Sequence, residues 1–198
     1  MSGLIGLTGS IGMGKSTTAK MFADQGIPIW DADRAVHTLY AKGGSAVAPV
    51  AELVPDAHNK DAIDRDLLKQ ALAKDPDLFP KLEAIVHPLV AQNRAEFISA
   101  HADAPILLFD IPLLFETGAE KWLDAVVVVS APPEIQRSRV LAREGMTEDR
   151  FQMILSRQIP DAEKRSRADF VIPTTDLDTA RQSVTQILDQ LRKEAPDA

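Results

Sequence analysis

The stretch Leu4-Ile5-Gly6-Leu7-Thr8-Gly9-Ser10-Ile11-Gly12-Met13-Gly14-Lys15-Ser16 decides the fold of this chain. Gly9, Gly14, Lys15 and Ser16 in it fit the pattern G-x-x-x-x-G-K-[ST], which forms a loop that holds phosphates between a strand and a helix. A chance glycine-rich turn with a solvated lysine is the alternative, and it is disfavoured because an apolar run precedes the pattern and a helix-prone segment follows it. We therefore expect residues 9–16, the phosphate loop, to bind a nucleoside triphosphate.

Each part of the phosphate loop has a chemical task. Glycines let the backbone turn its N–H groups toward the phosphates, and the helix that follows directs its positive end at the same anion. Lys15 would neutralise the β and γ phosphates, and the hydroxyl of Ser16 would hold a Mg²⁺ ion.

The composition fits one globular domain with a hydrophobic core, because 45% of the 198 residues are hydrophobic and 26% are charged. A net charge of −7 argues against a protein whose main task is to bind nucleic acid. The chain has no cysteine, which excludes disulfides and cysteine-bound metals. We see no export signal and no run of about 18 apolar residues that could span a bilayer, so we expect a cytoplasmic protein without membrane contact.

Acidic residues follow the second expected strand. Ile27-Pro28-Ile29-Trp30 reads as a short strand, and it ends in Asp31-Ala32-Asp33. Acidic side chains at the carboxyl end of a parallel strand lie where such folds bind ligands. One of the two aspartates could instead cap the helix expected at residues 34–41. Two of them beside a phosphate loop favour a catalytic role for at least one.

Residues 43–101 contain helical patterns and no convincing strand. Asp64 is a plausible cap of one helix, and Pro88 could kink or divide another that runs over residues 77–100. Such a block between two strands is typical of an inserted substrate-binding region. Asn59-Lys60-Asp61-Ala62 resembles the guanine-reading N-K-x-D, but alanine stands where the second aspartate is needed, so we reject a GTPase.

Two continuous apolar runs, residues 104–110 and 124–130, predict strands that are buried on both faces. The first run ends in Asp110, which could steady Mg²⁺ or its waters beside the phosphate loop. Capping of the next segment explains that aspartate equally well. A short strand at residues 168–172 and an amphipathic helix capped by Asp176 follow. The apolar stripe expected to pack that helix in the core comprises Leu177, Ala180, Val184, Ile187, Leu188 and Leu191.

Residues 134–167, the lid segment, predict a helix–turn–helix with a net positive charge. Gln136, Arg139 and Arg143 fall at i, i+3 and i+7, on one face of a helix that Gly145 would break. Thr147 can cap the next helix. The common face of the arginines favours a lid that closes over the triphosphate and excludes water, rather than a solvated charged helix pair.

This order of elements predicts an α/β fold: a P-loop NTPase-like, doubly wound parallel β-sheet in three α/β/α layers, with a helical substrate-binding insertion and a helical lid. We expect a single kinase domain over residues 1–198. Its core would comprise about 1–33, 104–133 and 168–198, its insertion about 34–103, and its lid about 134–167. The length leaves no room for the partner modules of motor or transport ATPases, which favours a small phosphotransferase with Asp33 as the base.

The chain also resembles a specific family, the dephospho-coenzyme A kinases. The residues that carry the resemblance are 7–16, Asp31-Ala32-Asp33, Asp64-Arg65, His87-Pro88, Pro112-Leu113-Leu114-Phe115-Glu116, Gln136, Arg139, Arg143 and Gln158. Many families share the phosphate loop, but the other motifs at these separations are far more specific. The resemblance implies transfer of the γ-phosphate of ATP, with Mg²⁺, to the ribose 3′-hydroxyl of dephospho-coenzyme A, the last step of coenzyme A synthesis.

The resemblance implies three groups of site residues. The catalytic residues are Asp33, Lys15, Arg139 and Arg143. The ATP-binding residues are Ser10, Ile11, Gly12, Met13, Gly14, Lys15, Ser16, Thr17 and Arg143, with Ser16 and Asp110 as candidate Mg²⁺ ligands. The residues that bind the acceptor are Asp31, Asp33, Arg65, His87 and Leu113.

One segment departs from the family pattern: Ile172-Pro173-Thr174-Thr175-Asp176 stands where the family has asparagine and glycine near the adenine. The rival functions are another small-metabolite kinase, acting on a nucleoside or nucleotide, and a non-catalytic nucleotide-binding regulator. The sequence gives no indication of the oligomeric state.

Overall fold

The computed structural model describes residues 3–194 of the chain and divides it into two units. The core unit comprises residues 1–30 and 101–198, and the helical unit comprises residues 31–100. Within residues 3–194, none of the helices combines the length and the apolar character that crossing a bilayer requires.

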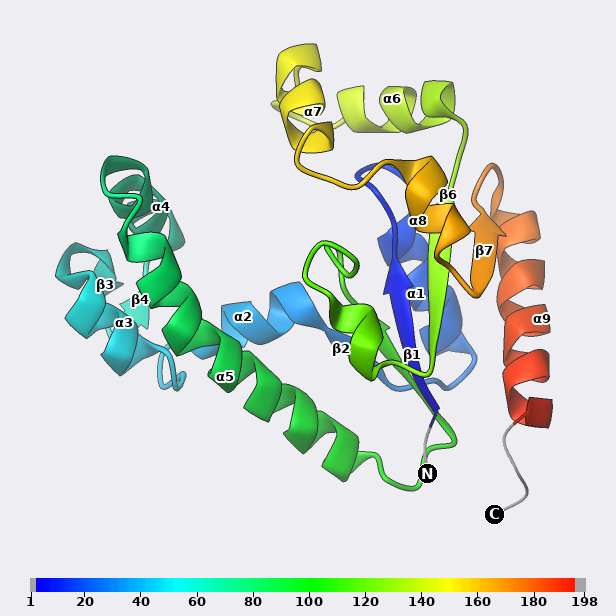
Figure 1. Ribbon diagram of the computed structural model, residues 1–198, viewed down its shortest axis with the longest axis horizontal. Helices are drawn as coiled ribbons and strands as arrows, with labels where there is room; N and C mark the ends of the chain where they lie inside the picture. The colour runs from blue at the N-terminus through cyan, green and yellow to red at the C-terminus, as the bar shows by residue number, and fades with distance from the viewer. Residues whose placement is uncertain (1–2, 195–198) are drawn as a thin grey trace. The chain divides into compact units, whose positions relative to one another are not determined.

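A five-stranded sheet in the order β2-β5-β1-β6-β7 organises the core unit (Figure 1). Its strands are β1 (Gly3–Thr8), β2 (Ile29–Asp31), β5 (Ile106–Asp110), β6 (Ala125–Ser130) and β7 (Phe170–Pro173). β1 pairs in parallel with β5 and with β6, and β6 pairs in parallel with β7. Every residue of β5 and of β6 is buried, as their continuous apolar runs predict. The predicted parallel α/β fold is confirmed.

Helices α1 (Lys15–Asp24) and α9 (Leu177–Glu194) pack on each other, α1 also contacts β1 and β5, and α9 contacts β7 (Figure 1). Phe22 of α1 and Leu188 of α9 are fully buried in the core that they share with the sheet. The prediction that Leu177 belongs to this core is wrong, because 53% of it is exposed. Leu177 is the first residue of α9, and the buried stripe begins one turn later at Ala180. From their sequence we expect the C-terminal residues 194–198 to fray, and those beyond Glu194 lie outside the described part of the chain.

The lid segment forms three helices, α6 (Pro133–Leu141), α7 (Glu148–Leu155) and α8 (Asp161–Ser166). Thr147 caps α7 as predicted, because its hydroxyl accepts from the N–H of Arg150 at 3.3 Å. The prediction that Arg143 continues the first of these helices is wrong. Its N–H donates to the carbonyl of Val140, three residues back, so the backbone has left the α-helical pattern by that point.

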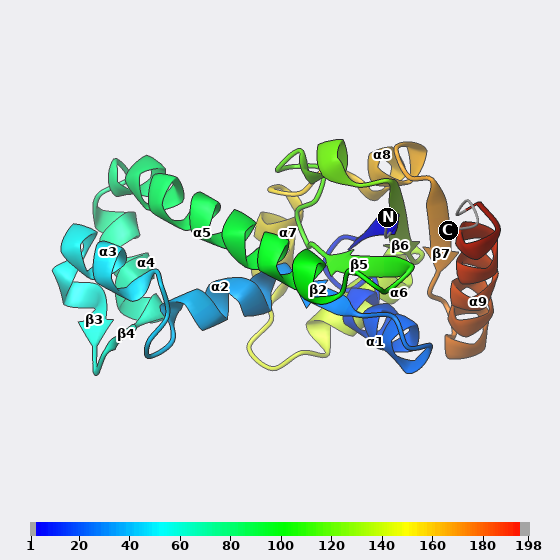
Figure 2. The same cartoon turned by 90° about the horizontal axis from the view of Figure 1, so that it is seen from below.

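The helical unit contains α2 (Ala32–Tyr40), α3 (Val47–Leu53), α4 (Arg65–Lys74) and α5 (Leu78–Ala100), with a 3₁₀ turn at Pro55–Ala57 (Figure 2). The prediction that it has no strand is wrong, since β3 (His58–Asn59) and β4 (Ala62–Ile63) pair as a short antiparallel hairpin beside α3. Lys60 and Asp61 both have positive φ, as a two-residue type I′ turn requires. The run that resembles N-K-x-D is therefore a hairpin turn.

The helical unit has a hydrophobic core of its own, which includes Leu39, Val50, Leu68 and Val86. The α5 helix contains Pro88 in its interior and is not divided there.

Asp64 caps α4 as predicted, because its carboxylate accepts from the N–H groups of Asp66 and Leu67 at 3.0 and 3.1 Å. The hydrogen bonds from Leu67 and Asp66 hold the pKa of Asp64 below its ordinary value.

Candidate active site

The phosphate loop presents the start of α1 to a ligand. Gly14 occupies the N-cap with a φ of 87°, no side chain caps the helix, and its first turn has no acidic residue. The earliest N–H that bonds back within the helix is that of Thr18, to the carbonyl of Gly14 at 3.0 Å. The N–H groups of the first turn and the positive end of the helix are thus directed at a common anion site.

The loop lies close against its neighbours at two further glycines. A Cβ atom at Gly9 would collide with the side chain of Val129 in β6. One at Gly12, where φ is 79°, would collide with the side chain of Val140 in α6. Glycine is therefore required at both positions, by close packing at the first and by packing and backbone conformation at the second.

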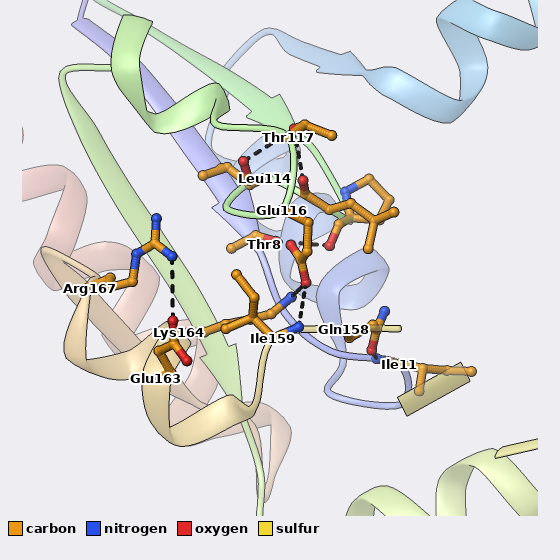
Figure 3. Close-up of polar contacts among 12 residues, drawn as sticks. Thr8, Ile11, Leu114, Glu116, Thr117, Gln158, Ile159, Glu163, Lys164 and Arg167 are labelled. Atoms are coloured by element: carbon orange, nitrogen blue, oxygen red, sulfur yellow. Dashed lines mark hydrogen bonds and ion pairs between the residues drawn. The ribbon is translucent and has the colours of Figure 1, made fainter. Parts of the chain in front are cut away.

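Side chains from outside the phosphate loop form hydrogen bonds with the backbone of Ile11 and of Met13. The N–H of Ile11 donates to Oε1 of Gln158 at 3.1 Å, and the carbonyl of Ile11 accepts from Nε2 of Gln136 at 2.8 Å. Figure 3 shows the first of these contacts. The carbonyl of Met13 accepts from the hydroxyl of Thr174 at 2.8 Å.

Lys15 and Asp110 form an ion pair between Nζ and Oδ1. Asp110 ends β5, beside β1, and is 4% exposed. This contact places the Asp110 carboxylate beside the phosphate loop, as its expected role at a Mg²⁺ site requires.

The oxygen atoms available beside the loop suit Mg²⁺. The exposed side chain of Ser16 offers a hydroxyl and Asp110 offers a carboxylate, and both are hard oxygen ligands. Residues 3–194 contain no group of three or more histidine or acidic side chains that could hold a metal by themselves. An ion here would take its remaining ligands from phosphate and water, as Mg²⁺ usually does.

The two lid arginines have different surroundings. The guanidinium of Arg139 donates to the hydroxyl of Thr174 at 3.3 Å and also to its carbonyl. Arg143 lies beyond the end of α6 with an exposed side chain, for which the described part of the chain shows no hydrogen bond or ion pair. Arg139 is therefore fixed to the segment after β7, whereas Arg143 can move toward a ligand.

The loop that follows β5 carries the expected acceptor residue Leu113. Leu113 is 41% exposed, whereas its neighbours Leu114 and Phe115 are buried. In the motif of residues 112–116, the side chains of Leu114 and Phe115 thus anchor the loop that follows β5, and the side chain of Leu113 is left at the surface.

Glu116 ends this motif and is held by the lid segment (Figure 3). Its Oε1 lies 2.8 Å from Nζ of Lys164, which is fully buried, and accepts from the N–H of Ile159 at 2.9 Å. Burial acts to raise the pKa of Glu116, but the Lys164 ammonium and the Ile159 N–H outweigh it, so this pKa lies below its ordinary value.

The expected acceptor residues of the helical unit all lie at exposed or half-buried positions. Asp31 caps α2 by accepting from the N–H of Arg34 at 2.9 Å. Asp33, in the first turn of α2, is exposed, and its side chain makes no hydrogen bond or ion pair within the described residues. The helix thus uses Asp31 and leaves the Asp33 carboxylate available for chemistry. Arg65 begins α4 and His87 lies on α5, and both are exposed.

The charge of Arg65 also affects the pKa of Tyr40, a buried residue of α2. Burial raises the pKa of Tyr40, and the positive charge of Arg65 opposes that rise without cancelling it.

Sequence reasoning did not identify Thr174 or Lys164 as site residues. Thr174 joins the phosphate loop, the end of β6 and Arg139, since its hydroxyl also lies 3.3 Å from the carbonyl of Ser130. The only signal for it was its position just after a strand, where the segment departs from the family pattern. Lys164 gave no signal, because a lysine in a short charged helix is ordinarily solvated.

Known proteins with similar sequences agree with one another. A family model described as dephospho-CoA kinase matches residues 3–178. A dephospho-CoA kinase of Jannaschia sp. (strain CCS1) is 57% identical over 191 residues, which cover 96% of this chain and 98% of that protein. A second, from Ruegeria pomeroyi, is 57% identical over 188 residues, 95% of each chain.

Solved structures agree on the fold. TT1252 from Thermus thermophilus aligns with a TM-score of 0.85 and 33% identity over 96% of this chain and 97% of its own. Dephospho-CoA kinase from Campylobacter jejuni aligns with a TM-score of 0.67 and 21% identity over 96% and 97%. With 57% identity to named relatives over nearly the whole length and a family model that matches residues 3–178, this chain belongs to the dephospho-CoA kinase family.

Proposed function

We propose that the chain transfers the γ-phosphate of ATP to the ribose 3′-hydroxyl of dephospho-coenzyme A, the last step of coenzyme A biosynthesis. The observation that carries the proposal is the 57% identity to dephospho-CoA kinases over nearly the full length of both chains. The uncapped helix start behind Gly14, with Lys15 beside it, supports the ATP half of this reaction.

On the nucleotide side, the N–H groups of the loop and the ammonium of Lys15 bind the phosphates. Ser16 and Asp110 would hold Mg²⁺, which when bound neutralises charge on the β and γ phosphates. Arg143 supplies a further positive charge from the lid segment, which closes to exclude water.

On the acceptor side, Asp33 accepts the proton of the 3′-hydroxyl as that oxygen attacks the γ-phosphorus. Its carboxylate suits this role because no other described group uses it. Asp31, Arg65, His87 and Leu113 bind and orient the acceptor, which brings the hydroxyl into line with the phosphate.

An ADP-release assay with a panel of acceptors tests the proposal. We expect dephospho-coenzyme A to accelerate ADP release, and nucleosides and nucleoside monophosphates to leave it at the background rate. Acceleration by a nucleoside or nucleotide alone would assign the chain to another small-metabolite reaction. ATP binding without turnover for any acceptor would indicate a regulator.

A further inference from the structure

The peptide groups of Ile11 are held from both sides by glutamine side chains. Gln158 accepts from the N–H of Ile11, and Gln136 donates to its carbonyl, at 3.1 and 2.8 Å. Because a backbone N–H can only donate and a carbonyl can only accept, the two amides have fixed and opposite tasks. Gln158 must present its oxygen and Gln136 its nitrogen.

The two glutamines come from different parts of the lid segment. Gln136 lies on α6, and Gln158 lies in the link between α7 and α8. The lid segment is therefore fastened at two places to one residue of the phosphate loop, while residues 142–157, which lie between these places, are not held to Ile11 by any contact that the structure gives.

Gln158 itself has a firm support. The N–H of the next residue, Ile159, donates to Glu116, which is paired with the fully buried Lys164 (Figure 3). This support fixes the backbone from which the Gln158 side chain extends toward Ile11.

Packing alone does not hold the loop at this place. A cavity of about 280 Å³ adjoins the loop, and its lining includes Ser10, Gln136 and Gln158. Space therefore remains beside these side chains, and the two hydrogen bonds add to the close packing at Gly12 in holding the peptide groups of Ile11.

We propose that Gln158, together with Gln136, is a positioning residue for ATP: the two amides hold the phosphate loop in its nucleotide-binding conformation before the nucleotide arrives. Affinity is gained when a binding loop needs no further ordering, because the cost of ordering it is not taken from the binding energy. The inference rests on the proposed use of the phosphate loop for ATP.

Paired glutamate variants test the opposite tasks of the two amides. Gln158→Glu and Gln136→Glu each add one carboxylate beside Ile11, but only the carboxylate at position 158 can still accept the hydrogen bond it replaces. We expect ADP, measured by titration calorimetry without any acceptor, to bind Gln136→Glu at least about threefold more weakly than Gln158→Glu. Gln182→Glu, on the exposed side of α9, is the control for added charge and should bind ADP as the unmodified protein does.

A third variant keeps the test decisive if Gln136→Glu does not fold. Gln158→Met removes the acceptor without adding charge, and we expect the KM for ATP to rise about fivefold while kcat and the KM for the acceptor stay nearly constant. A lowered melting temperature with an unchanged KM for ATP would make Gln158 merely structural and overturn the inference. Equal ADP affinities of the two glutamate variants would also overturn it. Absence of ADP binding by the unmodified protein would instead remove the proposed function, and this inference with it.

Discussion

The ammonium of Lys15 pairs with the carboxylate of Asp110, although 95 residues separate them in the chain. Lys15 begins the helix behind the phosphate loop, and Asp110 ends the strand next to β1. The charge of Lys15 is thus balanced by a buried carboxylate. Bound phosphates would share that ammonium with Asp110.

Replacement of Lys15 should lower both activity and stability, and a second replacement at Asp110 should restore the stability alone. We expect Lys15→Met to lower kcat/KM for ATP by about 100-fold or more, because a positive charge that stabilises the transferred phosphoryl group is gone. It should also lower the melting temperature, because the buried carboxylate of Asp110 loses its ion pair with Lys15. The double variant Lys15→Met/Asp110→Asn should recover the melting temperature but not the activity. Recovery of neither, or of both, would contradict this account.

Asp33 is the expected base. We expect Asp33→Asn to lower kcat by roughly two orders of magnitude, since the amide cannot take the proton of the acceptor hydroxyl. ATP affinity, measured by calorimetry, should be unchanged. Asp56→Asn removes an exposed carboxylate from the same unit and serves as the control. Turnover near the unmodified rate in Asp33→Asn would remove Asp33 from the mechanism.

The two lid arginines should respond differently to truncation. Arg143→Ala should lower kcat about tenfold or more at an unchanged melting temperature, because its exposed side chain has no structural contact among the described residues. Arg139→Ala should lower both kcat and the melting temperature, because the hydroxyl and the carbonyl of Thr174 no longer accept hydrogen bonds from the guanidinium. Thermal unfolding and steady-state kinetics of both variants are the measurements. A destabilised Arg143→Ala with unchanged kcat would make Arg143 the structural arginine.

Glu116 should make stability depend on pH in the acid range. Its pKa is lower in the folded chain than its ordinary value of 4.5, so the ionised form favours folding. This contribution is complete above about pH 4.5 and is lost as the pH falls through the lowered pKa. Denaturant unfolding should therefore show that the unmodified protein is more stable than Glu116→Gln at pH 7, and that the difference shrinks below pH 4.5. If the difference in stability between the two proteins is the same at pH 7 as below pH 4.5, the ion pair of Glu116 with Lys164 is not its source.

Local chemistry made much of the fold and part of the site predictable from the sequence. The phosphate loop, the two buried strands and the caps Asp64 and Thr147 each depend on residues within a few positions of one another. Predictions failed at two helix ends, since α6 stops before Arg143 and the buried stripe of α9 starts after Leu177, and they missed the short hairpin of β3 and β4. Helix ends respond to backbone hydrogen bonds that periodicity does not reveal.

The sequence by itself determined the chemistry that we propose for the site: a lysine, a serine hydroxyl and glycines to hold a triphosphate, and an acid to activate a hydroxyl. Only the tertiary structure decided which groups restrain them. Asp110 forms an ion pair with Lys15. The side chains of Gln158 and Gln136 hold the backbone of Ile11, and the fully buried Lys164 forms an ion pair with Glu116. These contacts join residues from 48 to 147 positions apart, so they exist only because the strand order β2-β5-β1-β6-β7 brings the ends of separate strands together with the lid segment.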